Sequence, residues 1–193
     1  MNGFKKFLIE SEIPSIQNTT PNDQDEILTQ SFVECFPQYN NPEIIDFVKN
    51  AVDWDISLKA TVDNKIIAFY LLGTRPLSET MSDENAHEQP EENLQRYDSM
   101  NGVEGVALGV IPEFRSKGIA TQLKNKIRNS GFDFIYGMQY KELGNLENWT
   151  SGSTINRRLV AQSETDAPVY ITIEDISPKA KNSTLHNKEL KNS

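Results

Sequence analysis

The stretch VALGVIPEFRSKGIATQL, residues 106–123, changes character halfway and decides the fold. It begins as an apolar run typical of a buried strand, which ends at Pro112. The run Arg115–Lys117 then brings positive charge, Gly118 follows, and the apolar spacing after it predicts a helix over Ile119–Arg128. A basic joint with a glycine thus links strand and helix, although the whole chain of 193 residues carries a formal net charge of -9.

A joint of this kind is suited to bind an anion. The first amides of a helix have no intrahelical acceptor, and the helix dipole makes that end partially positive. Gly118 lacks a β-carbon and lets a phosphate approach the backbone, while the small Ala120 lets the first turn pack against the sheet. Arg115 and Lys117 add charge. The sequence therefore predicts a diphosphate site here, with an ordinary basic loop that caps a helix as the alternative.

Outside this joint the pattern predicts one α+β domain, residues 1–176, around a mixed central sheet. Thr20 and Asn41 are expected to cap two helices, and Asp63-Asn64 is expected to form the turn of a hairpin. Residues 141–156 have no clear pattern. The predicted helices span residues 20–37, 41–52 and 119–128, and the predicted strands span residues 4–9, 56–62, 65–73, 103–110, 132–139, 157–162 and 167–176.

Two segments differ from the rest in composition. Residues 74–101 are acidic, poor in apolar side chains and without a period, which predicts a long mobile loop inserted in the domain. Residues 177–193 are polar and predict a disordered tail. Neither segment is therefore expected to contribute to the hydrophobic core.

Charge and cysteine content exclude several classes of protein. The negative net charge argues against binding to nucleic acid or to an anionic membrane, because the overall field repels phosphate. Cys35 is the single cysteine, which fits a reducing compartment, and its predicted helix face favours a core residue over an acyl carrier. No stretch is apolar enough for a signal peptide or a bilayer span, so a cytoplasmic protein is expected. His87 and His186 lack partners at ligand spacing and predict no metal site.

The basic joint resembles the acetyl-CoA loop of the GNAT superfamily of N-acetyltransferases. The signature of that family, [Gln/Arg]-x-x-Gly-x-[Gly/Ala], is matched by Arg115, Gly118 and Ala120. The family places an apolar-Val-x-Pro-Glu-aromatic phrase before it, which is similar to Val-Ile-Pro-Glu-Phe at residues 110–114. The resemblance covers roughly residues 23–176 and is sharp over residues 103–123, and it implies a GNAT-like fold with a mixed central sheet flanked by helices.

The resemblance also implies acetyl-CoA, or another short acyl-CoA, as the co-substrate, without a metal, and two sets of residues that bind it. The residues expected at its diphosphate are Arg115, Ser116, Lys117, Gly118, Ile119 and Ala120. The residues expected beside its pantetheine arm are Leu108, Gly109 and Val110. A backbone amide of this second set would polarise the thioester carbonyl.

Direct acetyl transfer needs a base, because a lysine-type ammonium has a pKa of about 10.4. Glu104 lies 11 positions before Arg115, where histone-acetyltransferase-like members of the family place a catalytic glutamate; a solvated carboxylate at a strand end is the alternative. Many members protonate the leaving thiolate with a tyrosine, for which Tyr140 is the candidate and Tyr136 the second choice. The usual spacing of that tyrosine phrase is absent, and packed aromatic residues are the alternative.

The acceptor implied by the resemblance is an amine. The acidic residues 74–101 would form a wall that concentrates a cationic acceptor, such as a polyamine, an aminoglycoside or a lysine side chain, with a solvated linker as the alternative. Two other functions stay open: a catalytically inactive acyl-CoA-binding module, and a protein-interaction domain without affinity for a nucleotide. Monomer and homodimer stay open as well.

Overall fold

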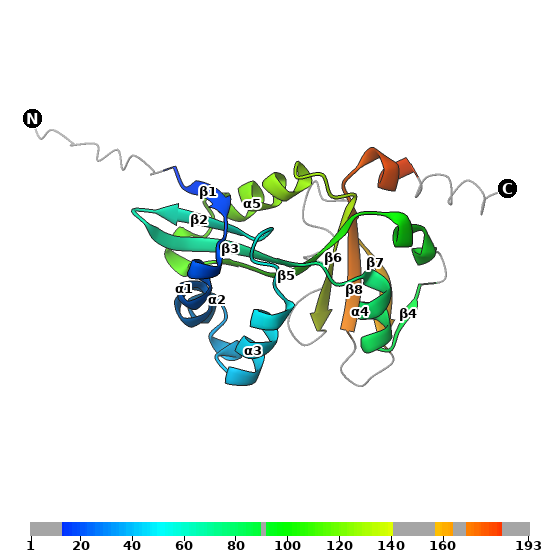
Figure 1. Cartoon of the computed structure of the whole chain (residues 1–193), viewed down its shortest axis with the longest axis horizontal. Coiled ribbons are helices and arrows are strands. Elements are labelled where there is room, and N and C mark those ends of the chain that lie inside the picture. Colours follow the sequence, from blue (N-terminus) through cyan, green and yellow to red (C-terminus); the bar gives the residue numbers. More distant parts are fainter. Residues whose placement is uncertain (1–12, 90–91, 141–156, 164–168, 183–193) are drawn as a thin grey trace, which may run out of the picture.

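The computed structural model describes residues 13–89, 92–140, 157–163 and 169–182. These residues form one sheet of eight strands in the order β1-β2-β3-β5-β6-β8-β7-β4 (Figure 1). Neighbouring strands are antiparallel except β5 and β6, which are parallel. The strands are β1 Ser15–Asn18, β2 Leu58–Val62, β3 Lys65–Gly73, β4 Ala86–Glu88, β5 Gly102–Val110, β6 Phe134–Tyr140, β7 Arg157–Ser163 and β8 Val169–Asp175.

Helices cover both faces of the β2-β3-β5 part of the sheet. Helices α1 to α3 lie on one face and α5 on the opposite face, while α4 lies beside β7 and β8 (Figure 1). The helices are α1 Gln24–Glu26, α2 Phe32–Cys35, α3 Pro42–Ala51, α4 Leu77–Asp83 and α5 Ile119–Arg128; a π-helical turn, Ile27–Ser31, joins α1 to α2. Among the described residues, no helix is long and apolar enough to cross a membrane.

Most of the elements predicted from the sequence are confirmed. Thr20 is the N-cap of the first helical segment, where its amide donates to the Asp23 carboxylate at 2.7 Å, and the Asn41 side chain caps α3 by accepting from the Glu43 amide at 2.8 Å. Asp63 and Asn64 have φ of 48° and 63°, as a tight turn between β2 and β3 requires. The strand β1 was not predicted, and the predicted strand at residues 4–9 and the undecided segment 141–156 lie outside the described residues.

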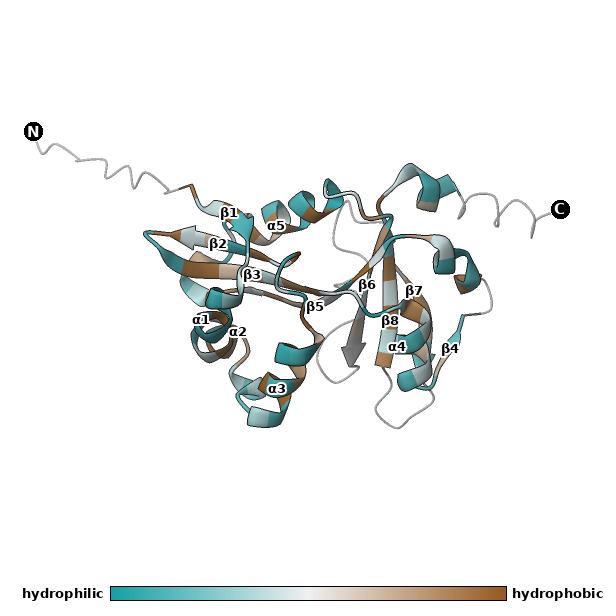
Figure 2. Ribbon diagram, viewed as in Figure 1, coloured by the Kyte–Doolittle hydropathy of each residue, from teal (hydrophilic) through white to brown (hydrophobic). Residues whose placement is uncertain are grey.

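The buried side chains form two clusters, one on each side of the β5–β6 pair. The first surrounds β3, which is buried on both faces between α5 and the N-terminal helices. The second surrounds β8, a strand with hydrophobic residues, drawn in brown in Figure 2. Its buried members are Leu77, Leu94, Tyr97, Phe134, Tyr136, Val160, Ala161, Ile171 and Ile173.

The prediction of a mobile loop over residues 74–101 is wrong. This segment contains α4, β4 and a 3-10 helix over Leu94–Ser99. Leu77 and Leu94 are each 6% exposed and belong to the β8 cluster. The Tyr97 hydroxyl donates to the Asp175 carboxylate at 2.6 Å. Leu77, Leu94 and Tyr97 are buried, so a few apolar side chains are enough to order a segment whose overall composition is polar.

The prediction of a disordered tail from residue 177 is wrong for the part of it that the structure describes. Residues 178–182 are helical, and Ala180 is fully buried. Ser177 fastens this turn, because its amide donates to the Asp133 carbonyl at 3.0 Å and its hydroxyl donates to the Asp133 carboxylate at 2.6 Å. The domain therefore extends past its predicted end at residue 176.

Leu94→Ala tests whether the acidic segment is part of the folded core. Removing a buried leucine side chain should lower the free energy of unfolding by about 2–5 kcal/mol, measured by urea denaturation. Gln95→Ala is the matched control, because Gln95 is the exposed neighbour on the same 3-10 helix and should change stability by less than about 0.5 kcal/mol. Equal, small effects of the two substitutions would contradict the packing described here.

Candidate functional site

The β5–β6 ladder stops early, and this opens the centre of the sheet. Parallel pairing joins Gly102–Glu104 to Phe134–Tyr136 and ends there, although β5 continues to Val110 and β6 to Tyr140. On its other side β5 stays paired with β3, but the register shifts so that Val106 is an extra residue. A bulge of this kind bends a strand. We call the region beyond Glu104 and Tyr136, where the strands separate in Figure 1, the β5–β6 divergence.

The far end of β5 leads into the basic joint before α5. Ser116 and Gly118 both have positive φ, of 62° and 77°, and Gly118 is the N-cap of α5. Among the described residues, no hydrogen-bond acceptor engages the main-chain amides of residues 116–120. Residues 115–118 are also exposed. The joint therefore presents a set of free amides to solvent at the positive end of a helix.

The two basic side chains of the joint, Arg115 and Lys117, contact groups just before it in the chain. The Arg115 Nε donates to the Val110 carbonyl at 3.0 Å, which ties the joint back to the end of β5. The Lys117 Nζ lies 4.7 Å from the centre of the Phe114 ring. Ile119 is 3% exposed and packs in the core, while Ala120 is half-buried in the first turn of α5. Of the residues predicted for a diphosphate, Ile119 could therefore contribute its backbone but not its side chain.

The residues predicted beside the pantetheine arm lie at the end of β5. Leu108 and Val110 are half-buried. Gly109 is required by packing, because a β-carbon there would lie 2.4 Å from the Phe69 ring and 2.8 Å from the Cys35 sulfur. Burial raises the pKa of the Cys35 thiol to about 11, so at neutral pH it is protonated and is no nucleophile. Cys35 is thus the core residue that the sequence favours.

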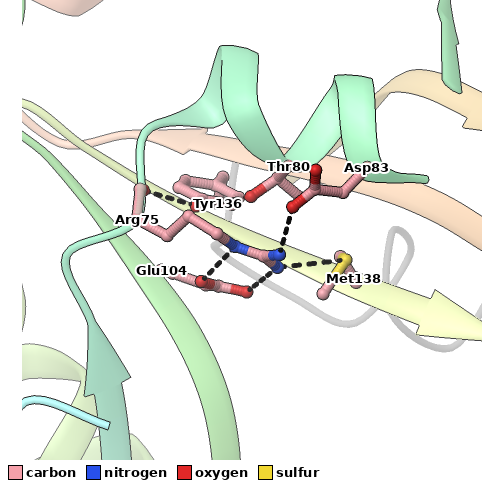
Figure 3. Close-up of polar contacts among 6 residues, drawn as sticks. All are labelled: Arg75, Thr80, Asp83, Glu104, Tyr136 and Met138. Carbon is pink, nitrogen blue, oxygen red and sulfur yellow. Dashed lines mark hydrogen bonds and ion pairs between the residues drawn. The ribbon is translucent and has the colours of Figure 1, made fainter. Parts of the chain in front are cut away.

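Glu104 lies at the start of the β5–β6 divergence and is 3% exposed. Its two carboxylate oxygens accept hydrogen bonds from Arg75, one from Nη2 at 3.0 Å and one from Nε at 3.4 Å (Figure 3). A third nitrogen of Arg75, Nη1, lies 3.3 Å from the Asp83 carboxylate on α4. Burial disfavours the charged guanidinium, yet the hydrogen bonds with Glu104 raise the pKa of Arg75 above its usual value. The predicted base is therefore buried and paired, not a solvated strand-end carboxylate.

Tyr136 fixes the backbone at the same place. Its hydroxyl donates to the Arg75 carbonyl at 2.6 Å and lies 2.9 Å from the Thr80 hydroxyl of α4 (Figure 3). Burial, together with the nearby charge of Glu104, raises the pKa of Tyr136 well above its ordinary value. Tyr136 is thus a packed aromatic residue with a buried hydroxyl. Tyr140 is the last residue of β6, and its side chain lies outside what the structure describes.

An open pocket of about 410 Å³ lies beside Glu104. One wall belongs to α3 and includes Phe47, whose side chain is 55% exposed. The opposite wall belongs to α4. The lining residues are Phe47, Asn50, Ala51, Thr74, Arg75, Glu79, Asp83 and Glu104, so three carboxylates face one guanidinium. A hollow of about 520 Å³ beside the Asp63-Asn64 turn is larger, but among the described residues Asp63 is the one charged residue in its lining.

Sequence reasoning found Glu104 but missed the residues that surround it. Arg75, Thr80 and Asp83 fell in the segment predicted to be a mobile loop. The available signal was an isolated arginine directly after a strand buried on both faces, where a cation needs a carboxylate partner. Among the described residues, no group of three His, Cys, Asp or Glu side chains is placed to hold a metal ion.

The chain matches solved structures in shape. No family model matches it, and no curated protein matches its sequence. A GNAT-family protein from Desulfovibrio desulfuricans superimposes with a TM-score of 0.59 at 12% identity, covering 86% of this chain and 100% of that chain. Arylalkylamine N-acetyltransferase 2 from Aedes aegypti gives a TM-score of 0.59 at 12% identity, with 85% and 99% covered. The PaiA N-acetyltransferase from Thermoplasma acidophilum, solved in complex with coenzyme A, gives 0.51 at 13% identity, with 84% and 99% covered.

These identities are too low to transfer an activity, but the shapes agree over nearly the full length of each of these three structures. The agreement also covers more than four fifths of this chain, including its mixed sheet flanked by helices. The α+β architecture predicted from the order of the elements, and the GNAT-like fold implied by the residues around Gly118, are therefore confirmed. The chain has the fold of the GNAT acetyltransferases.

Proposed function

We propose that this chain is an acetyltransferase that moves the acetyl group of acetyl-CoA directly to an amine. One observation carries the proposal. A single strand, β5, bears a buried carboxylate, Glu104, where its pairing with β6 ends, and leads at its other end into the free amides of residues 116–120. Our candidates for the base and for the anion site thus lie toward the two ends of the same strand.

The joint before α5 fits the diphosphate of coenzyme A. The place that a β-carbon of Gly118 would occupy has no atom within 4 Å, so an oxygen could approach the backbone there. The free amides offer hydrogen bonds, and the helix end and Lys117 offer positive charge. One protein of the same fold, the Thermoplasma PaiA N-acetyltransferase, is solved with coenzyme A. These observations support Arg115, Ser116, Lys117, Gly118, Ile119 and Ala120 as the residues around the diphosphate.

The edge of β5 fits the amide groups of a pantetheine arm. Residues 105–108 are half-buried, whereas β3 on the other side is buried almost throughout. The parallel pairing to β6 has ended at this point, so backbone groups of β5 face the divergence. We therefore propose that Leu108, Gly109 and Val110 run beside the arm. The co-substrate supplies an acetyl group activated as a thioester.

Glu104 is our candidate for the base. The amine nitrogen adds to the thioester carbonyl, the carbon–sulfur bond then breaks with release of the thiolate, and the amine proton must go to an acceptor, directly or through water. Glu104 lines the pocket through which an amine could reach the divergence. Tyr140, the last residue of β6, is our candidate for the acid that protonates the leaving thiolate.

The pocket favours a cationic amine as the acceptor. Glu79 and Asp83 on α4 lie one helical turn apart and line the same wall, which gives the entrance a negative field. The exposed ring of Phe47 on α3 offers an apolar surface opposite them. The Aedes protein of this fold is named for arylalkylamine acceptors, which combine an amine with an aromatic ring. An amine that carries an apolar part fits both walls.

A second function is favoured by one observation. Both oxygens of Glu104 already accept hydrogen bonds from Arg75, as they would in a protein where the carboxylate has a structural role alone. The alternative is therefore a module that binds acyl-CoA without turnover. It shares the co-substrate site with the proposed enzyme and differs from it in the role of Glu104.

Gly118→Val tests the co-substrate site. Valine at a φ of 77° is strained, and the joint must change shape to relieve the strain, so we expect the Kd for coenzyme A to rise at least about tenfold, measured by calorimetry. Gly131→Val is the matched control, because Gly131 also has a positive φ, of 92°, and open space at its β-carbon, but lies past the other end of α5. It should lose stability and keep its Kd. Equal Kd values for all three proteins, or no binding by any, would contradict the proposal.

Glu104→Gln separates the enzyme from the binding module. Loss of a general base should lower kcat by about 10²–10⁴-fold, while the Kd for coenzyme A stays unchanged. The measurement is release of coenzyme A with a panel of amines under saturating acetyl-CoA. Glu174→Gln is the matched control, because Glu174 is also buried and paired with an arginine, Arg128, away from the pocket, and should keep its turnover. Binding without turnover for every amine would favour the module, and full turnover by Glu104→Gln would exclude Glu104 as the base.

A further inference from the structure

Glu104 is the more deeply buried member of an ion pair. Its carboxylate is buried, and among the described residues Arg75 is its one cationic partner. The contact is bidentate, with Nη2 and Nε each donating to a different oxygen. Bidentate pairs of this kind fix the orientation of a carboxylate as well as its charge. Arg75 therefore controls two properties of Glu104 at once.

The other groups around Glu104 cannot replace Arg75. On α4, Glu79 and Asp83 line the same pocket and are acidic. On β6, the Tyr136 phenol is neutral and its hydroxyl donates to the Arg75 carbonyl rather than to Glu104. Without the guanidinium, Glu104 would be a buried carboxylate with two further carboxylates at the same pocket. A buried charge that loses its partner is strongly disfavoured and takes up a proton instead.

Arg75 is itself held from several elements. Its carbonyl accepts from Tyr136 on β6, whose hydroxyl also contacts Thr80 on α4 (Figure 3). Its Nη1 contacts Asp83 on α4 at 3.3 Å, and its Nη2 lies 3.8 Å from the Met138 sulfur on β6. Contacts to both the backbone and the guanidinium leave little freedom to this arginine. It can therefore set the position of Glu104 rather than follow it.

We propose that Arg75 is a positioning residue for the transfer reaction, because it holds Glu104 ionised and turned toward the pocket, where it can accept a proton from the acceptor amine. The inference rests on the proposed function of Glu104. In the resting state the guanidinium occupies both oxygens, and each oxygen keeps a further lone pair for a proton or for a bridging water. Arg75 acts through Glu104 and takes no part in bond formation.

The test is the dependence of kcat/KM on pH for wild type, Arg75→Gln and Arg75→Lys. Arg75→Gln removes the cation, so the acid limb of the profile should move to higher pH by about one to three units. Arg75→Lys keeps a cation without the bidentate geometry, so its acid limb should return toward that of wild type while its kcat stays below the wild-type value. The KM for acetyl-CoA should be the same for all three proteins, because Arg75 lies away from the joint before α5.

Arg128→Gln is the matched control. Arg128 and Glu174 form a pair at 2.6 Å between α5 and β8, and the arginine side chain is 23% exposed, against 22% for Arg75. Breaking this pair disturbs a comparable contact away from the pocket, so the pH profile of activity should match that of wild type. A shift common to both variants would mean that loss of any such ion pair moves the profile, and it would overturn the proposal.

A second measurement does not need turnover. The stability that Arg75→Gln loses relative to wild type should be smallest at low pH, where Glu104 is protonated in both proteins, and should grow as the pH rises. In a Glu104→Gln background this dependence on pH should shrink to the part that the exposed Asp83 carboxylate contributes through its contact with Arg75. Superimposable activity profiles for Arg75→Gln and wild type would overturn the role of Arg75 and leave the proposed function intact. If wild type turns over no amine, the proposed function fails. In that case the stability measurement still tests Arg75, because a loss of stability in Arg75→Gln that does not vary with pH would overturn its proposed effect on Glu104.

Discussion

The early end of the β5–β6 ladder is the constraint on which the rest of the structure depends. Three residue pairs hold the two halves of the sheet together, and then an extra residue, Val106, bends β5 away from its neighbour. A ladder continued to Val110 would close the sheet, satisfy the edge of β5 and leave no opening. Because it stops at Glu104, that residue, the free edge of β5 and the joint at Gly118 all belong to one opening.

The opening includes a buried carboxylate, and the segment after β3 supplies the partner that this carboxylate needs. Glu104 is a buried carboxylate, and Arg75 supplies its cationic partner. To deliver Arg75, the chain must turn directly after β3 and pack α4 beside β6, where Tyr136 and Thr80 hold the turn. The contacts that fold the acidic segment are thus the same ones that bring a cation to the candidate site. As a consequence, the acidic face of α4 forms a wall of the pocket.

The elements that could be predicted from the sequence are those that short-range rules determine. The helix over Ile119–Arg128 follows from its apolar spacing, the caps from Thr20 and Asn41, and the hairpin from Asp63-Asn64, because each depends on a few adjacent residues. Residues 74–101 were misjudged because their order comes from distant partners: Leu94 packs against strands about 40 or more positions away, and Tyr97 bonds to Asp175. The pairing of Arg75 with Glu104 is likewise invisible to a local pattern. The bulge had a weak signal in Gly105, since a glycine inside a strand often marks one.

We expect the amides before α5 to bind the diphosphate of coenzyme A. The most direct measurement is a titration of the ¹⁵N-labelled protein with coenzyme A, followed by amide chemical shifts in NMR spectra. The amides of residues 116–120, which have no acceptor in the described part of the chain, should show the largest shifts and should saturate together, followed by those of residues 105–110 on β5. Unchanged signals at residues 116–120, with or without shifts elsewhere, would contradict the proposal that these amides bind the diphosphate.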